Sequence, residues 1–243
     1  CVRILTLDNR SALGALSLAT SMASGSKLQF GSMAKPLHAG LAARSGITAA
    51  RLASAGVDAN EEPFDGPWGF ISLHHSGLHE ESRQPDDLSI LVDGLAQKRW
   101  PCCASAHRTL DAIQALMKDN QIQPEDIETI ETVIPDSNYR NLRFHNPKNE
   151  NEARFSMTYT AAVMALRGVV TLRDFRPDTI SDQAVRDLMM KVRVSSAGPQ
   201  SDQGDGIWDD PAVTRIFTRS REMFEKSVLH PVGTLHLPLS ETD

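Results

Sequence analysis

The chain has 243 residues, of which 40% are hydrophobic and 23% charged, and its formal net charge is −6 at pH 7. This acidic balance argues against nucleic acid as a partner, because lysine and arginine are scattered and form no basic stripe for phosphates. No apolar run approaches the ~20 residues that a membrane-spanning helix needs, so we expect no contact with a membrane.

Cysteine usage and the start of the sequence point to the cytoplasm. The three cysteines, with Cys102 and Cys103 adjacent, are an odd number and do not form a disulfide framework. The N-terminal stretch lacks a charged segment followed by an apolar one and a cleavage site, so no secretory leader is recognisable. We therefore expect a protein of a reducing cytoplasm.

The N-terminal part of the sequence is rich in alanine, leucine and other residues that favour helices. We expect helices at 11–24, 36–55 and 67–73. Pro36 suits the first turn of the second helix, and Gly56 follows its end in the position that favours glycine. A polar stretch comes next, and we interpret its histidines as a solvated surface patch, with a metal ligand set as the alternative: His74, His75 and His79.

The pattern changes near Leu95 to a mixture of helix and strand. Apolar periodicity predicts helices at 106–118, 151–166 and 181–190, the last with Ser181 as its N-cap. Alternating β-branched residues predict strands at 127–134 and 191–196. After Ala197 we expect a loop and then a short helix at 211–226. The fold class is therefore α+β: residues 1–94 form a segment of an all-helical domain, and residues 95–230 form a smaller α+β domain.

Two stretches combine lysine with histidine. In FGSMAKPLHAG, Lys35 and His38 lie three residues apart and so share a helix face. This arrangement could hold a cation over a small anionic ligand, and it could equally be an ordinary helix start. In QKRWPCCASAH, Lys98 and His107 flank the two cysteines close to a bend marked by proline.

Metal and nucleotide sites are not favoured. Adjacent cysteines such as Cys102 and Cys103 rarely ligate one ion, and no second cysteine pair exists. A thiol nucleophile stays open, although Cys102 is better explained as a small buried hydrophobe. No GxGxxG or P-loop pattern occurs, so no nucleotide site is indicated.

Four motifs in order make the chain resemble the MmgE/PrpD family: SMAKPLHAGLAARSGITAARLASAGV, GPWGF, KRWPCCASAH and NEARFSMTYTAAVMALRGVVTL. The resemblance runs from about Val2 to Ser196. It implies a large helical domain and a smaller α+β lid domain, with the active site in the cleft between them. It also implies a cofactor-free lyase or isomerase on a small di- or tricarboxylate, which abstracts a proton next to a carboxylate as 2-methylcitrate dehydratases do.

The resemblance further implies roles for particular residues. The lysines of the first and third motifs, Lys35 and Lys98, would be catalytic residues that bind substrate carboxylates. Tyr159, in the last motif, would assist proton transfer or orientation. The candidates for substrate binding are His38, Cys103, His107 and Arg154. Cys103 stands where some members of the family carry histidine. Because the family chemistry needs no metal ion and no other cofactor, we expect none.

Two departures from the family pattern bear on the function. From the resemblance we expect the chain to start about halfway through a family member and to diverge from the family after Ser196. We therefore expect a homo-oligomer, or a complementing N-terminal chain, to complete a site for a small carboxylate substrate. The alternatives are a catalytically incomplete remnant or interaction module that keeps the fold without turnover, and a regulator that binds carboxylates. Dehydration, decarboxylation and epimerisation all stay open.

Overall fold

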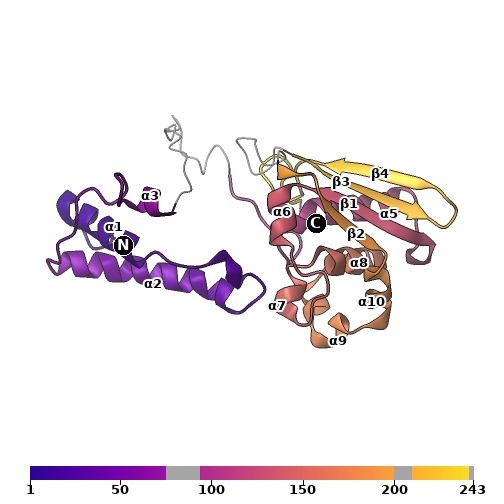
Figure 1. Ribbon diagram of the computed structural model, residues 1–243, viewed down its shortest axis with the longest axis horizontal. Helices are drawn as coiled ribbons and strands as arrows, with labels where there is room; N and C mark the ends of the chain where they lie inside the picture. Colours follow the sequence, from indigo (N-terminus) through magenta and orange to yellow (C-terminus); the bar gives the residue numbers. More distant parts are fainter. Residues whose placement is uncertain (75–93, 200–209, 241–243) are drawn as a thin grey trace. The chain divides into compact units, whose positions relative to one another are not determined.

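The computed structural model describes residues 1–74, 94–199 and 210–240. The chain divides into two compact units, Cys1–Asp86 (unit 1) and Asp87–Asp243 (unit 2), and each is described by itself (Figure 1). Within the three described ranges, no helix is both long and apolar enough to pass through a membrane.

Unit 1 is built on two long helices. α1 (Asn9–Met22) and α2 (Ala34–Ser54) lie side by side, and a short 3-10 turn, η1 (Lys27–Gln29), lies between them in the chain (Figure 1). Asp8 caps α1, because its carboxylate accepts a hydrogen bond from the Ser11 amide at 2.8 Å. The third helix predicted for this part is the short α3 (Phe70–His74).

The contact between α1 and α2 buries mainly small side chains. Its core consists of Ala15, Ala50 and Ala53. Larger apolar side chains stay at the surface, and Leu37 and Ile47 are each at least half exposed. Alanine lets the helices approach closely but removes little apolar surface from water, and each large aliphatic side chain left exposed forgoes about 1.5–3 kcal/mol of burial. Unit 1 therefore has only a small core of its own among the described residues.

From this exposed apolar surface we predict that the chain self-associates, or binds a hydrophobic dye, through unit 1. Leu37→Glu should reduce both effects, because a charge replaces an apolar side chain on that surface. Leu172→Glu, at an equally exposed position of unit 2, is the matched control and should change neither. Sizing chromatography and dye fluorescence are the measurements. A monodisperse wild-type monomer that binds no dye would contradict the prediction.

Unit 2 contains a four-stranded mixed sheet in the order β2-β1-β3-β4 (Figure 1). β1 (Ile127–Ile134) runs parallel to β2 (Val192–Ser196) and antiparallel to β3 (Ala212–Thr218), which pairs with β4 (Met223–Val228). The strand predicted at 127–134 has the same bounds as β1, and the one predicted at 191–196 is β2. With the helices of both units, the sheet confirms the α+β fold class.

Helices cover one face of this sheet. α5 (His107–Asp119) contacts β3 and β4, while α8 (Met157–Arg167) contacts β2, α5 and α10 (Gln183–Met189). Fully buried side chains from both layers, among them Ile113 and Ile130, form the core between them. The shorter helical elements of unit 2 are η2 (Ala104–Ala106), η3 (Pro124–Asp126), α6 (Asp136–Asn141), α7 (Glu150–Ala153), η4 (Leu172–Phe175) and α9 (Pro177–Ile180).

The helix predicted at 211–226 is wrong, because this segment forms the hairpin of β3 and β4. Burial along AVTRIFT alternates between buried and half-buried positions, which is the period of a strand and not of a helix. Between the strands, Arg221 adopts a left-handed conformation with φ of 67°, as a tight turn requires. The sequence obscures this period, because apolar Val213 and Phe217 lie on the less buried side of the strand and polar Thr214 on the buried side.

Two other predicted helices differ from the structure, one by a break in the middle and one at its start. The helix predicted at 151–166 is two helices, α7 and α8, because Ser156 is extended and forms a bridge with Arg143 before it caps α8. The helix predicted at 181–190 is α10, which starts two residues later, at Gln183. Its N-cap is Asp182, whose carboxylate accepts the Ala184 amide at 3.0 Å, and not Ser181.

Buried hydroxyl groups join α5 to the sheet. Thr109 Oγ1 of α5 lies 2.9 Å from Thr132 Oγ1 of β1, which lies 3.2 Å from Thr214 Oγ1 of β3. All three side chains are at most 1% exposed. Because a buried hydroxyl without a partner loses its hydrogen bonds to water and gains nothing, these contacts restrict how α5 can slide over the strands. We call these three residues the threonine ladder.

Thr132→Val tests the threonine ladder. Valine has nearly the shape of threonine but removes the central hydroxyl, so Thr109 and Thr214 each lose a partner. We expect the free energy of unfolding to fall by about 1–3 kcal/mol in urea denaturation. Thr129→Val, at a less buried position of the same strand, should change it by less than about 0.5 kcal/mol. Equal effects of the two substitutions would show that the ladder adds no stability.

Candidate active site

Lys98 lies in the segment that leads into η2, the first helical turn in the described part of unit 2. Its Nζ donates a hydrogen bond to the backbone oxygen of Cys102 at 2.9 Å, which closes the bend predicted from the Trp-Pro pair. Trp100 in this bend is buried, while Lys98 is exposed. A lysine ammonium has three hydrogens, so Lys98 can bind a further acceptor such as a carboxylate oxygen without leaving Cys102.

The two adjacent cysteines have different environments. Cys102 is buried, and burial raises the pKa of its thiol well above the ordinary value, so this thiol is unreactive at pH 7. The prediction of a small buried residue at this position agrees with that burial. Cys103 is half-buried and precedes η2, and its amide donates to the backbone oxygen of Arg154 at 2.9 Å. This bond brings the third and fourth sequence motifs together.

His107, the first residue of α5, is 2% exposed. Its Nε2 is buried and has no hydrogen-bond partner in the described part of the chain. Burial, with a smaller contribution from the Lys98 ammonium, lowers the pKa of the imidazole to about 4. His107 is therefore neutral at pH 7. A neutral imidazole whose electrostatic environment includes the Lys98 ammonium is a candidate proton acceptor.

Arg154 connects this cluster to Tyr159. The Arg154 guanidinium lies 3.8 Å from Glu150 Oε2 and 5.2 Å from the centre of the Phe175 ring. The Phe175 ring in turn lies 6.1 Å from the ring of Tyr159. Within unit 2, contacts therefore run from Lys98 and Cys103 through Arg154 to Tyr159. Backbone atoms and the Phe175 ring thus link four of the five candidate residues of unit 2, namely Lys98, Cys103, Arg154 and Tyr159.

Tyr159 is fully buried, and its hydroxyl donates a hydrogen bond to the backbone oxygen of Asp174. Burial raises the pKa of this phenol above its ordinary value, with a further contribution from the Asp174 carboxylate. Tyr159 therefore stays protonated, and its proton points at a backbone oxygen. This geometry suits a residue that holds its surroundings in place better than one that gives up a proton.

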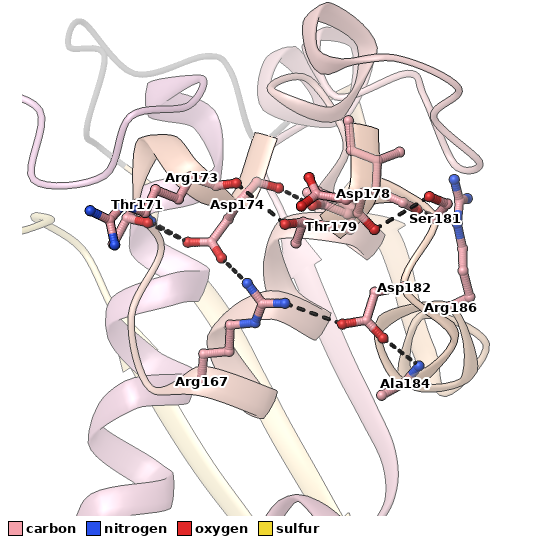
Figure 2. Close-up of polar contacts among 12 residues, drawn as sticks. Arg167, Thr171, Arg173, Asp174, Asp178, Thr179, Ser181, Asp182, Ala184 and Arg186 are labelled. Carbon is pink, nitrogen blue, oxygen red and sulfur yellow. Dashed lines mark hydrogen bonds and ion pairs between the residues drawn. The ribbon is translucent and has the colours of Figure 1, made fainter. Parts of the chain in front are cut away.

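Asp174 is itself fixed by a polar network that the sequence analysis missed. Figure 2 shows its carboxylate between the guanidinium of Arg167 and Thr171, which donates from its amide at 2.6 Å and from its hydroxyl at 2.8 Å. Arg167 also reaches Asp182, the N-cap of α10, at 3.3 Å. The signal available in the sequence was the T-x-x-D spacing of a capping box at 171–174. The network fixes the loop on which Tyr159 rests.

Lys35 and His38 belong to unit 1. Lys35 is the second residue of α2, which begins at Ala34, two residues before the predicted start at Pro36. Its Nζ lies 5.5 Å from the centre of the Phe30 ring. The His38 ring lies against Gly25, where an added Cβ would come within 3.1 Å of Nδ1. Because each unit is described by itself, the prediction that Lys35 and Lys98 face one cleft stays a prediction.

Metal ligands do not gather in the described ranges: no group of three or more His, Cys, Asp and Glu side chains there could hold an ion. Of the three clustered histidines, His74 ends α3 with its ring 4.4 Å from that of Phe70. His75 and His79 lie outside the described residues.

Comparison with known proteins places both units in one family. Residues 1–81 match the MmgE/PrpD N-terminal domain and residues 100–243 match the MmgE/PrpD C-terminal domain. The chain belongs to the MmgE/PrpD family. Since the second match extends over the β3-β4 hairpin to the end of the sequence, the expectation that the likeness of this MmgE/PrpD chain ends at Ser196 is wrong.

Two relatives of this MmgE/PrpD chain are cis-aconitate decarboxylases. The protein from Mus musculus is 30% identical over 241 residues, which cover 94% of this chain and 48% of that protein. The protein from Homo sapiens is 33% identical over 199 residues, which cover 79% of this chain and 41% of that protein. The chain thus spans about half the length of the curated relatives it matches.

The buried histidine gives this MmgE/PrpD chain a pH-dependent stability. The pKa of His107 is about 4 in the folded state and near its ordinary value of 6.5 in the unfolded chain. Between these values the unfolded chain binds a proton that the folded chain does not, so the free energy of unfolding falls as the pH is lowered. From pH 7 to pH 5 we expect a loss of about 2 kcal/mol from this residue.

Urea denaturation at both pH values tests this loss. His107→Gln should remove it from the difference between pH 7 and pH 5. His236→Gln, at an exposed histidine of the same unit, should leave the difference as it is in the wild type. If His107→Gln shows the full wild-type difference, the imidazole is not held neutral.

Proposed function

We propose that this chain supplies part of the active site of a cofactor-free lyase or isomerase that acts on a small di- or tricarboxylate. The observation that carries the proposal is the pair of Lys98 and His107 in unit 2. Lys98 offers an ammonium at a fixed place on the surface, and its charge helps to lower the pKa of the buried, neutral His107. Chemistry next to a carboxylate needs both a cation for the carboxylate and a group that exchanges a proton at carbon.

The relatives narrow the substrate class within this proposal. Their name, cis-aconitate decarboxylase, specifies a tricarboxylate, and a tricarboxylate needs more than one cation. We assign Lys98 to one carboxylate and Lys35, at the N-terminal end of α2, to another, since a helix N-terminus also attracts anions. Arg154 and Cys103 would line the same site, with His38 beside Lys35. Tyr159 would orient this region through its bond to Asp174.

A second candidate function is an interaction module or remnant that keeps the fold without turnover. Its support is the small alanine core of unit 1. In either case we propose that a second copy, or a complementing chain of the same family, covers the exposed apolar side chains of unit 1. We also propose a cytoplasmic location.

Ligand binding tests the first candidate. We use tricarballylate, a saturated tricarboxylate that cannot react, and titrate it by calorimetry with EDTA present so that metal ions are excluded. Lys98→Met should raise the dissociation constant about 10- to 100-fold, because one charged hydrogen bond to a carboxylate is lost. Lys35→Met should do the same.

Nearby lysines serve as controls. Lys118→Met, in the last turn of α5, and Lys27→Met, in η1, should leave the dissociation constant within about twofold of the wild type. Conversion of cis-aconitate, followed by product analysis, then separates an enzyme from a binding protein. A wild-type chain that binds neither compound favours the second candidate.

A further inference from the structure

Two segments far apart in the chain meet beside Lys98. The first is Gln97–Trp100, and the second is the turn at 231–237 near the end of the chain. The Gln97 amide donates to the backbone oxygen of Gly233 at 2.7 Å, and the Gly233 amide donates to the backbone oxygen of Leu237 at 2.7 Å. The segment that carries Lys98 is therefore paired with the C-terminal part of unit 2 immediately before the lysine.

Asp111 of α5 binds both segments with one carboxylate. Its Oδ1 accepts a hydrogen bond from Trp100 Nε1 at 2.9 Å and lies 3.5 Å from a guanidinium nitrogen of Arg99. Its Oδ2 accepts the amide of Val232 at 2.9 Å. Burial raises the pKa of this carboxyl, and the bonds from Val232 and Trp100 oppose that shift because they favour the carboxylate.

Gly233 allows the two segments to come this close. It has φ of +100°, a conformation that side chains rarely adopt. A Cβ built at this position would lie 2.0 Å from the backbone oxygen of Gln97, a distance at which the two atoms overlap. Any larger residue at 233 must therefore push the Gln97–Trp100 segment away from the turn.

We propose, on the basis of the proposed function, that Asp111 is a positioning residue for Lys98, the lysine assigned to a substrate carboxylate. Gly233 holds Gln97 on one side of Lys98, and Asp111 holds Arg99 and Trp100 on the other. Both chain neighbours of Lys98 are thus held, while the exposed ammonium of Lys98 keeps hydrogens for a ligand beside its bond to Cys102. The turn at 231–237 becomes part of the site by the same bonds.

The cost of burying a carboxylate supports a positioning role. Packing of the Trp100 ring would by itself hold the segment near α5, and an apolar residue at 111 would avoid the desolvation of a charge. The carboxylate fixes the orientation of the Gln97–Trp100 segment, since its two oxygens accept hydrogen bonds from donors on the two segments. A lysine that binds a ligand needs a fixed backbone, because a small displacement of the backbone moves the ammonium at the end of its long side chain.

Asp111→Asn is the test variant. It keeps the volume of the side chain, but one accepting oxygen becomes an NH2 group that faces a donor. We expect amide hydrogen exchange at Gln97 to become about tenfold faster, because the Gln97 amide is bound to Gly233, the neighbour of Val232, whose amide binds Asp111. Acetylation of Lys98 by acetic anhydride, measured relative to Lys118 in the same chain, should also change severalfold.

Two further variants complete this part of the test. Gly233→Ala should reproduce both effects of Asp111→Asn from the other segment. Asp119→Asn, at the exposed end of the same helix, should show neither effect. These readouts need no ligand, so they decide the positioning even if the proposed function fails. Unchanged exchange at Gln97 and unchanged acetylation at Lys98 would overturn the proposal.

A double-mutant cycle with tricarballylate connects the positioning to binding. In the wild-type background, Asp111→Asn should raise the dissociation constant about five- to tenfold. In the Lys98→Met background it should raise it less than twofold, because the residue through which Asp111 acts is gone. Equal increases in both backgrounds would show that Asp111 serves folding alone and would also overturn the proposal. Absence of binding by the wild-type chain would instead refute the proposed function.

Discussion

The placement of α5 on the sheet is the interaction on which the rest of unit 2 depends. The threonine ladder fixes it, because three buried hydroxyls from α5, β1 and β3 satisfy one another and no other described group replaces them. Apolar packing between a helix and a sheet tolerates small shifts, whereas a chain of buried hydrogen bonds tolerates one arrangement. Once α5 is placed, the positions of His107 at its start and Asp111 one turn later follow.

The candidate residues of unit 2 come from two parts of the chain, the bend before α5 and the stretch from α7 to α8. Lys98 binds the backbone oxygen of Cys102 in the bend before η2, and its charge acts on the imidazole of His107 at the start of α5. Arg154 joins them through the Cys103 amide, and the break between α7 and α8 makes this contact possible by freeing the backbone oxygen of Arg154. A continuous helix over that stretch would have used this oxygen internally. The local irregularity is thus what connects the motifs.

Sequence reasoning succeeded where the deciding signal is local. β1 was predicted with its observed bounds because its β-branched residues alternate, and the start of α2 near Pro36 follows from the fixed backbone of proline. It failed at the β3-β4 hairpin, where charged residues obscure the alternation. It could not find Asp111, because the partner amide of Val232 lies 121 positions away and nothing local marks the pair. The capping box that holds Asp174 is an intermediate case, because its T-x-x-D spacing is visible in the sequence but its ion pair with Arg167 is not.

The parallel pairing of β1 with β2 has a kinetic consequence. The chain between these strands must form α6 to α10 and return before Ile130 can align with Val192. Such a closure is entropically costly and gains its hydrogen bonds only at the end, which makes non-local strand pairing a slow event in folding. Arg154 and Tyr159 both lie within this crossover. During synthesis, the segment with Lys98 is likewise made well before Gly233, whose backbone oxygen accepts the Gln97 amide, so this pairing forms only after the β3-β4 hairpin has left the ribosome.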